Sequence, residues 1–227
     1  MKKIILIAFV VALTFSSCQD EASMGVSKVV TYPTIAVKGD IAQTVPVGGS
    51  YVDKGCIVME GTTDLSSKIK TTGSVNAATP GVYTITYTYK SEGKIYPKDS
   101  LTLQARRYVG VVDAAASAMN ISGSYRRNAG ALGFATMKKL GYPGLYTNNN
   151  PGGATSNGTA TGTSVDNIVL YVFQTTSTTL VVPSQESSVG EFSCTGGIYD
   201  ASGASPLYKW ACVNPGYGTS TRTFVKQ

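Results

Sequence analysis

The sequence contains no histidine, and this absence removes several kinds of active site at once. Ser–His–Asp triads and Cys–His pairs need an imidazole as the general base. Zinc sites lose their commonest ligand. No phosphate-binding loop, CxxC pair or EF-hand spacing occurs either. We therefore expect neither a metal nor another cofactor.

Charge is also scarce, since charged residues make up 14% of the chain and the formal net charge is +6. Two of the positive charges, Lys2 and Lys3, lie in the first three residues. The other cations are scattered along the chain, whereas nucleic-acid-binding domains concentrate them on one face. The net charge therefore indicates solubility, and nucleic acid is not an expected partner.

Long helical patterns are missing too, because no heptad or extended 3.6-residue periodicity occurs. The abundant residues are Gly (25), Tyr (14), Ser and Thr. Aromatic and β-branched residues favour strands. The composition therefore predicts an all-β extracellular protein.

The first eighteen residues have the layout of an export signal. A basic start at Met1–Lys3 is followed by an uncharged apolar run, Ile4–Phe15, and then by Ser16, Ser17 and Cys18. The run is too short to cross a bilayer, which takes about 20 residues. The segment resembles a bacterial lipoprotein signal, with Phe15 in place of the usual leucine. The resemblance implies cleavage after residue 17, lipid on Cys18 and attachment to a membrane. The alternative is an ordinary secreted protein with a chance cysteine.

Residues 18–28 are predicted to form a tether. It begins with Cys18, Gln19, Asp20 and Glu21, and the acidic pair resembles the surface-export signal of Bacteroidota lipoproteins. This resemblance implies an outer-membrane lipoprotein exposed at the cell surface. A solvated tether that happens to be acidic is the alternative.

Residues 29–109 predict a first β-domain. In Pro80–Tyr89 the side chains of Tyr83, Ile85 and Tyr87 share one face, and threonines occupy the other. This alternation is typical of a half-buried antiparallel strand. The segments Gly48–Cys56 and Thr79–Tyr87 together resemble the bacterial immunoglobulin-like repeat of surface proteins. The resemblance implies a β-sandwich that acts as a non-catalytic spacer or adhesion module, with Cys56 as a buried thiol.

Residues 110–120 are small and weakly patterned, and this predicts a linker in which a helical turn could form.

The strand patterns in residues 121–227 predict a second antiparallel β-domain, either a sandwich or a barrel-like meander. Its segment Ile168–Phe173 is apolar on both faces and should lie in the core. The polar segment Thr147–Asp166 should be a mobile loop.

The second domain also carries a resemblance of its own. Ile121–Arg127, Gly141–Tyr146 and Gly152–Gly153 are similar to the C-terminal domain of Bacteroidota lipoproteins of unassigned activity. Those proteins are commonly associated with glycan-utilisation systems. The resemblance implies display near glycans, and the expected partner is either a polysaccharide or another outer-membrane protein.

One hairpin permits a prediction of register. If its strands fold symmetrically about Gly203, Cys194 faces Cys212, Gly196 faces Trp210, and Ile198 faces Tyr208. A disulfide between Cys194 and Cys212 is then within reach. Two reduced cysteines filling the core are the alternative, and a one-residue slip would separate the side chains.

The sequence bears on three function classes: an enzyme, a glycan-binding module and a scaffold. The acidic residues of the second domain sit in no recognisable motif, so an enzyme is not expected. Glycan binding is the sharper hypothesis, because aromatic rings with nearby amides can hold sugars. Against it, Trp210 points inward in the predicted register, and tyrosines beside Pro-Gly turns usually pack. The candidate ligand residues are Tyr142, Tyr146, Asn148, Asn149 and Trp210, with Asn150 and Tyr217 as further candidates.

The third class is a structural or adhesin scaffold without a small-molecule ligand of its own. Separately, Asp99–Leu101 resembles the Bacteroidota O-glycosylation site, which would place a glycan on Ser100.

Overall fold

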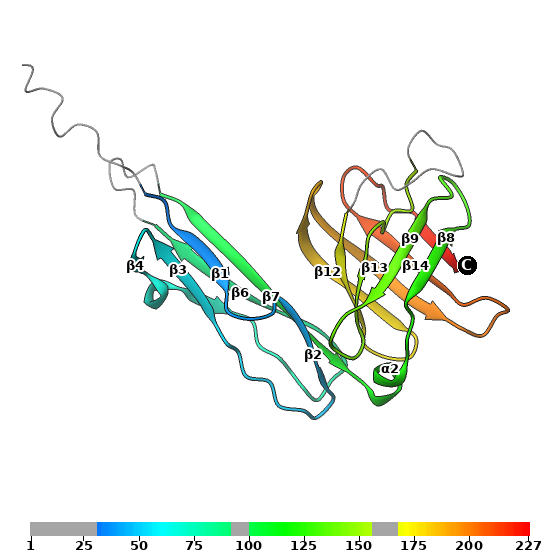
Figure 1. Cartoon of the computed structure of the whole chain (residues 1–227), viewed down its shortest axis with the longest axis horizontal. Helices are drawn as coiled ribbons and strands as arrows, with labels where there is room; N and C mark the ends of the chain where they lie inside the picture. The colour runs from blue at the N-terminus through cyan, green and yellow to red at the C-terminus, as the bar shows by residue number, and fades with distance from the viewer. Residues whose placement is uncertain (1–30, 92–99, 156–167) are drawn as a thin grey trace, which may run out of the picture. The chain divides into compact units, whose positions relative to one another are not determined.

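The computed structural model describes residues 31–91, 100–155 and 168–227 (Figure 1). Residues 33–227 form one compact unit. The predicted signal at residues 1–17, the lipid-bearing Cys18 and the tether at 18–28 lie outside the described residues. In the described part no helix is long and apolar enough to cross a membrane.

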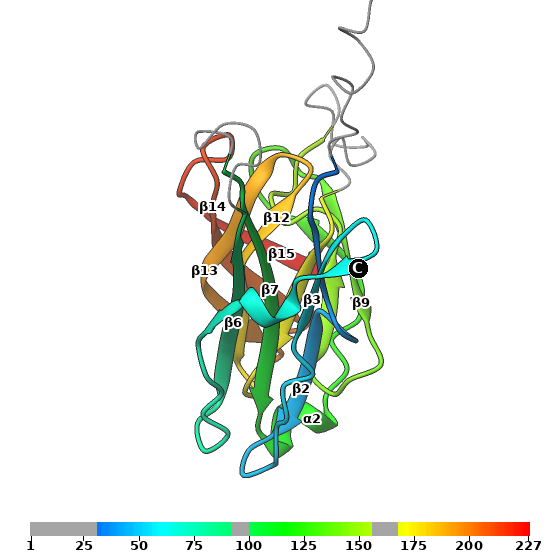
Figure 2. The same cartoon turned by 90° about the vertical axis from the view of Figure 1, so that its left-hand side faces the viewer.

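The N-terminal domain is a sandwich of two sheets, as predicted. One sheet has the order β1–β3–β4 and the other β2–β7–β6–β5, in which β2 runs parallel to β7 and the remaining pairs are antiparallel (Figures 1 and 2). A short 3₁₀ turn, η1 (Ser66–Lys68), follows β4. The strands are β1 (Thr34–Val37), β2 (Ala42–Pro46), β3 (Cys56–Glu60), β4 (Thr63–Asp64), β5 (Lys70–Thr72), β6 (Gly81–Lys90) and β7 (Thr102–Val112).

The alternation predicted for β6 is confirmed in its second half. Ile85, Tyr87 and Tyr89 are buried, while the threonines between them are only partly covered. Cys56 packs with Ile85 and Tyr87 in the core of this domain and donates to the Ala36 carbonyl at 3.0 Å. The prediction of a buried thiol at Cys56 is confirmed.

The C-terminal domain is a closed eight-stranded barrel, which resolves the choice between sandwich and meander. Each strand pairs antiparallel with the next, and the last strand pairs with the first. This up-and-down closure leaves no free sheet edge. The strands are β8 (Gly123–Arg127), β9 (Phe134–Lys139), β10 (Leu145–Asn148), β11 (Leu170–Gln174), β12 (Thr179–Ser187), β13 (Gly190–Asp200), β14 (Leu207–Val213) and β15 (Thr221–Lys226).

Aromatic side chains fill the middle of the barrel. The Tyr208 ring lies 4.5 Å from Trp210, 4.7 Å from Phe224 and 4.8 Å from Tyr125, measured between centroids. All four residues are fully buried. Barrels of this size either fill with side chains or hold one small ligand. Because the middle is filled here, a ligand could enter only at the barrel ends.

The predicted linker at 110–120 is built into the fold. Strand β7 continues to Val112, and a short helix, α2 (Ala114–Ala118), follows at once. The carboxylate of Asp113 caps this helix by accepting from the Ala116 amide at 2.7 Å. Since Val111, Val112 and Ala116 are buried, the end of β7 and one side of the helix pack against the protein, while Ala114, Ala115 and Ala118 are exposed.

Residues of the sandwich also contact the barrel directly. Ala42 and Tyr108 share one buried apolar cluster with Leu145 and Phe173. The Tyr108 hydroxyl donates to the Ser184 carbonyl at 2.9 Å. Around this cluster, Thr44 donates to the Pro143 carbonyl at 2.7 Å, and Arg106 pairs with Glu191 at 2.6 Å.

Candidate functional site

Three of the predicted ligand residues belong to the barrel interior. Tyr146, Asn148 and Trp210 are fully buried. Their donors are used within the protein: Tyr146 donates to Met119 O at 3.1 Å, Asn148 to the Tyr208 hydroxyl at 2.9 Å, and Trp210 to Pro151 O at 2.8 Å. The prediction that they bind a sugar is wrong, because none of them can reach a ligand. The prediction that Trp210 points inward is confirmed.

The other predicted candidates have structural partners as well. The Tyr142 hydroxyl donates to Asp40 at 2.6 Å, and this hydrogen bond raises the pKa of Tyr142. The Asn149 side chain accepts from the Thr136 amide at 2.7 Å. Asn150 is buried and bonds to Phe134 and Ala154. Tyr142 and Asn149 are half-buried, so ligand binding by these two residues stays a prediction, whereas the buried Asn150 is not accessible to a sugar.

The polar segment Thr147–Asp166 was predicted to be a mobile loop. Residues 147–155 instead form the end of β10 and a packed turn in which Asn148, Asn150 and Pro151 are buried. The prediction is wrong for these residues, because their side chains and carbonyls hold the barrel interior together. Residues 156–166 lie outside the described residues.

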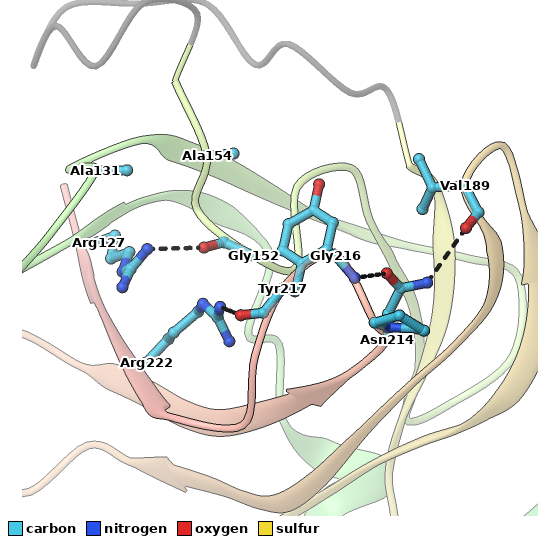
Figure 3. Close-up of a pocket in the computed structure, with 10 residues that line it drawn as sticks. Arg127, Ala131, Gly152, Ala154, Val189, Asn214, Gly216, Tyr217 and Arg222 are labelled. Atoms are coloured by element: carbon cyan, nitrogen blue, oxygen red, sulfur yellow. Dashed lines mark hydrogen bonds between the residues drawn. The ribbon is translucent and has the colours of Figure 1, made fainter.

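The structure does contain a pocket, at one end of the barrel (Figure 3). Its volume is about 560 Å³, within the range typical of small-ligand sites. It is bounded by the end of β8, the turn after β10, the β12–β13 turn, the β14–β15 turn and the start of β15. The lining residues are Arg127, Ala131, Gly152, Ala154, Val189, Asn214, Pro215, Gly216, Tyr217 and Arg222.

The β14–β15 turn is held in shape by its own side chains. Asn214 accepts from the Gly216 amide at 2.9 Å and donates to the Glu191 carbonyl at 3.0 Å. The Tyr217 ring packs edge-on against Phe192 at 5.1 Å. A Cβ at Gly152 would lie 2.2 Å from the Tyr217 ring, so this close approach requires glycine. The turn thus presents one aromatic ring at a fixed place in the pocket.

Two arginines complete the lining on the side opposite Asn214 (Figure 3). Arg222 is only 6% exposed, and it donates to the carbonyls of Ser220 and Tyr217. Arg127 donates to the Gly152 carbonyl at 3.2 Å. Burial and the nearby charge of Arg222 lower the pKa of Arg127. Guanidinium groups in such a setting are suited to planar anions such as carboxylates.

Below the pocket, Cys194 and Cys212 face each other across β13 and β14, as predicted. Both are free thiols in the structure, so the disulfide stays a prediction. The hydrogen bond from Cys194 and the charges of Arg222 and Arg127 lower the pKa of Cys212, while burial raises that of Cys194.

The rest of the predicted hairpin register is wrong. The pairing shifts between Thr195 and Ile198, so Ile198 faces Lys209 and Tyr199 faces Tyr208. Gly196 lies inside this irregularity with φ of +63° and therefore does not face Trp210. A bulge inserts an extra residue and moves the following side chains relative to the partner strand.

Within residues 31–91, 100–155 and 168–227, no cluster of three or more His, Cys, Asp or Glu could hold a metal ion. Ser100, the predicted glycosylation site, is exposed, whereas its neighbour Asp99 lies outside the described residues.

Comparison with known families identifies the sandwich. Residues 35–109 match the family described as "Bacterial surface protein, Ig-like domain". The chain carries a bacterial surface Ig-like domain. The matched residues are the Ig-like sandwich, and the barrel that follows lies outside the match.

Among solved structures, the lipoprotein BT2262 from Bacteroides thetaiotaomicron is similar to this chain at 22% identity. The match covers 86% of this chain and 100% of that one, with a TM-score of 0.37. No curated protein matches the chain.

Proposed function

We propose that this chain is a surface lipoprotein anchored through Cys18 and that it acts as a non-catalytic glycan-binding module. The barrel would carry the binding site, and the Ig-like domain would hold it away from the membrane. The main support for this proposal is the pocket of about 560 Å³ at the end of the barrel. There Tyr217 is held in a fixed position, whereas the barrel interior is filled with side chains.

The anchor is supported by the signal at residues 1–17, which ends directly before Cys18. Stable attachment takes at least two acyl chains, because a single chain gives only marginal membrane binding. The acidic residues Asp20 and Glu21 support export to the outer face of an outer membrane. The surface family of the first domain agrees with this location.

Glycan binding is supported by the chemistry of the pocket. Sugars present flat C–H faces that stack on aromatic rings, and their hydroxyls take hydrogen bonds from amides and guanidinium groups. Tyr217 can supply the ring, and Asn214, Arg127 and Arg222 lie around it. A largely preformed pocket also keeps the cost of ordering low on binding.

The test is binding of the soluble fragment from residue 22 onward, which contains the compact unit at 33–227. A panel of neutral and acidic polysaccharides would be screened by gel retardation, and positives measured by calorimetry. We expect binding that Tyr217→Ala abolishes. The control is Tyr32→Ala, because Tyr32 is 67% exposed and outside the pocket. Equal loss from both variants, or no binding to any polysaccharide, would contradict the proposal.

A spacer or adhesin scaffold is the second candidate. It is favoured by the apolar cluster of Tyr108, Leu145 and Phe173, which stiffens the connection between sandwich and barrel. A scaffold needs no pocket, so it predicts no glycan binding and the recovery of an outer-membrane protein partner in a pull-down.

A further inference from the structure

The two arginines of the pocket come from neighbouring strands at the same end of the barrel. Phe224 on β15 is the register partner of Arg127 on β8, and Arg222 precedes Phe224 by two positions. Side chains two apart on a strand share a face, so Arg222 points to the same side as the buried Phe224. Figure 3 shows both guanidinium groups together on one side of the pocket.

Neither arginine has a carboxylate partner among the described residues. In that part of the chain, Arg106–Glu191 and Arg107–Asp53 are the ion pairs, and both lie elsewhere. Arg127 donates to the Gly152 carbonyl and Arg222 to the carbonyls of Ser220 and Tyr217. The Arg222 side chain also interacts with the Cys212 thiol and lies 5.8 Å from the centre of the Tyr217 ring. Two cations are therefore held close together with no opposite charge from the described residues.

Arg222 also has an unused donor. Its Nε is buried and has no hydrogen-bond acceptor among the residues that the structure describes, and the whole residue is only 6% exposed. A buried donor without a partner is costly, and a buried charge without a counter-charge is more so. In native structures such a group calls for a partner, which a water, an ion or a ligand can supply.

We infer that the pocket takes an anionic group, a carboxylate or a sulfate, carried by an acidic polysaccharide. Arg127 and Arg222 would bind the anionic oxygens, and the Tyr217 ring would contact the sugar that carries them. A guanidinium binds such oxygens through two parallel N–H donors, which fixes orientation as well as charge. This inference rests on the proposed function and adds the chemical class of the ligand.

The experiment compares polymers that differ only in charge. Polygalacturonate is paired with its carboxyl-reduced form, and dextran sulfate with dextran, so that the two pairs separate carboxylate from sulfate. Affinity of the fragment from residue 22 onward is measured at low and at physiological salt. We expect an acidic polymer to bind about tenfold or more tightly than its neutral counterpart.

Three variants assign the effect to the pocket. Arg127→Gln and Arg222→Gln should each weaken binding of the acidic polymer about tenfold or more. Arg126→Gln is the matched control, because Arg126 is the neighbour of Arg127 on β8 and donates to the Leu132 carbonyl outside the pocket lining. Circular dichroism confirms folding, and Arg127, which is less buried than Arg222, provides the test if Arg222→Gln does not fold.

The outcomes separate the two proposals. Equal binding of charged and neutral polymers overturns the anionic ligand and leaves glycan binding standing. An equal effect of Arg126→Gln and Arg127→Gln shows general surface attraction and overturns the inference. Absence of binding to all four polymers overturns the inference, and the wider panel then decides whether glycan binding also fails.

Discussion

Cys194 on β13 and Cys212 on β14 face each other inside the barrel, and Cys212 also donates to the Pro151 carbonyl at 3.3 Å. Pro151 precedes Gly152, whose carbonyl accepts from Arg127 in the pocket. The thiol pair is thus connected to the proposed ligand site through the Pro151–Gly152 backbone. Its oxidation state would bear on the barrel and on the pocket together.

Oxidation should join Cys194 to Cys212. The two residues are cross-strand partners, and such positions suit disulfide geometry. A mild oxidant such as diamide should remove two hydrogens by intact mass and stabilise the fold by about 3 kcal/mol in denaturant unfolding. Peptide mapping should show the bridge, with Cys56 still free as the internal control. A bridge that includes Cys56, or none at all, would contradict the register.

Removing the carboxylate of Asp53 should destabilise the Ig-like domain. Asp53 pairs with the fully buried Arg107, which also donates to Gly55 O at 3.2 Å. Asp53→Asn leaves a buried charge without its partner, at a cost of about 3 kcal/mol in unfolding free energy. Glu186→Gln, at an exposed position on β12, is the control.

The same carboxylate predicts a pH dependence. Partial burial disfavours its charge, but hydrogen bonds from Tyr87, Gly55 and Tyr51 and the charge of Arg107 outweigh this and lower the pKa of Asp53 below 3.8. Its stabilising contribution is therefore present above pH 3.8 and is lost as the pH falls through the lower, folded-state value. Unfolding midpoints measured from pH 6 to pH 2 should show a smaller acid loss for Asp53→Asn than for the native protein. If the unfolding midpoints of Asp53→Asn and of the native protein fall equally with pH, the carboxylate of Asp53 does not cause the acid loss.

Adding one methyl group at Gly152 should disturb the pocket. The new Cβ would lie 2.2 Å from the Tyr217 ring, so the ring must move. We expect Gly152→Ala to cost about 1–3 kcal/mol of stability and to weaken glycan binding. Gly141→Ala is the matched control, since a Cβ there meets no atom within 4 Å. Calorimetry and thermal unfolding of both variants decide the point, and unchanged binding by Gly152→Ala would argue against a role for Tyr217.

The lipid anchor has its own test. Cells that express the full chain should incorporate radioactive palmitate into the protein, and Cys18→Ser should abolish the label. Lipid would then keep the native protein in the membrane fraction, whereas the variant is released. A label that persists in Cys18→Ser would contradict the anchor.

Period-two alternation was enough to predict the parts of the fold that depend on one strand. It gave the buried face of β6 from Ile85 and Tyr87. The same alternation could have located the pocket arginines, because Arg222 alternates with the buried Phe224 and Arg127 with the buried Tyr125. Residue type points the other way, because arginine is usually found on the surface.

Features that depend on contacts between several strands could not be predicted from the local sequence pattern. The irregular pairing at Gly196 shifted the hairpin register after Cys194 and Cys212 had been paired correctly. The segment Ile168–Phe173 was expected in the core, and this is confirmed for Ile168, Leu170, Val172 and Phe173, while Val169 is 52% exposed. The local pattern did not show that Val172 faces the barrel interior whereas Phe173 packs in the cluster shared with the sandwich. Asn148 and Asn150 looked like loop residues because their burial depends on the barrel closing around them.

The proposed ligand site is tested most directly by measuring which residues a bound polysaccharide protects from hydrogen–deuterium exchange. Hydrogen–deuterium exchange would be measured on the fragment from residue 22 onward, with and without the tightest-binding polymer of the panel. We predict slower exchange in the turn containing Gly152 and in residues 214–222, where the pocket lies. Protection confined to the Ig-like domain at 35–109, or no protection at saturating polymer, would contradict a ligand site at the mouth of the barrel.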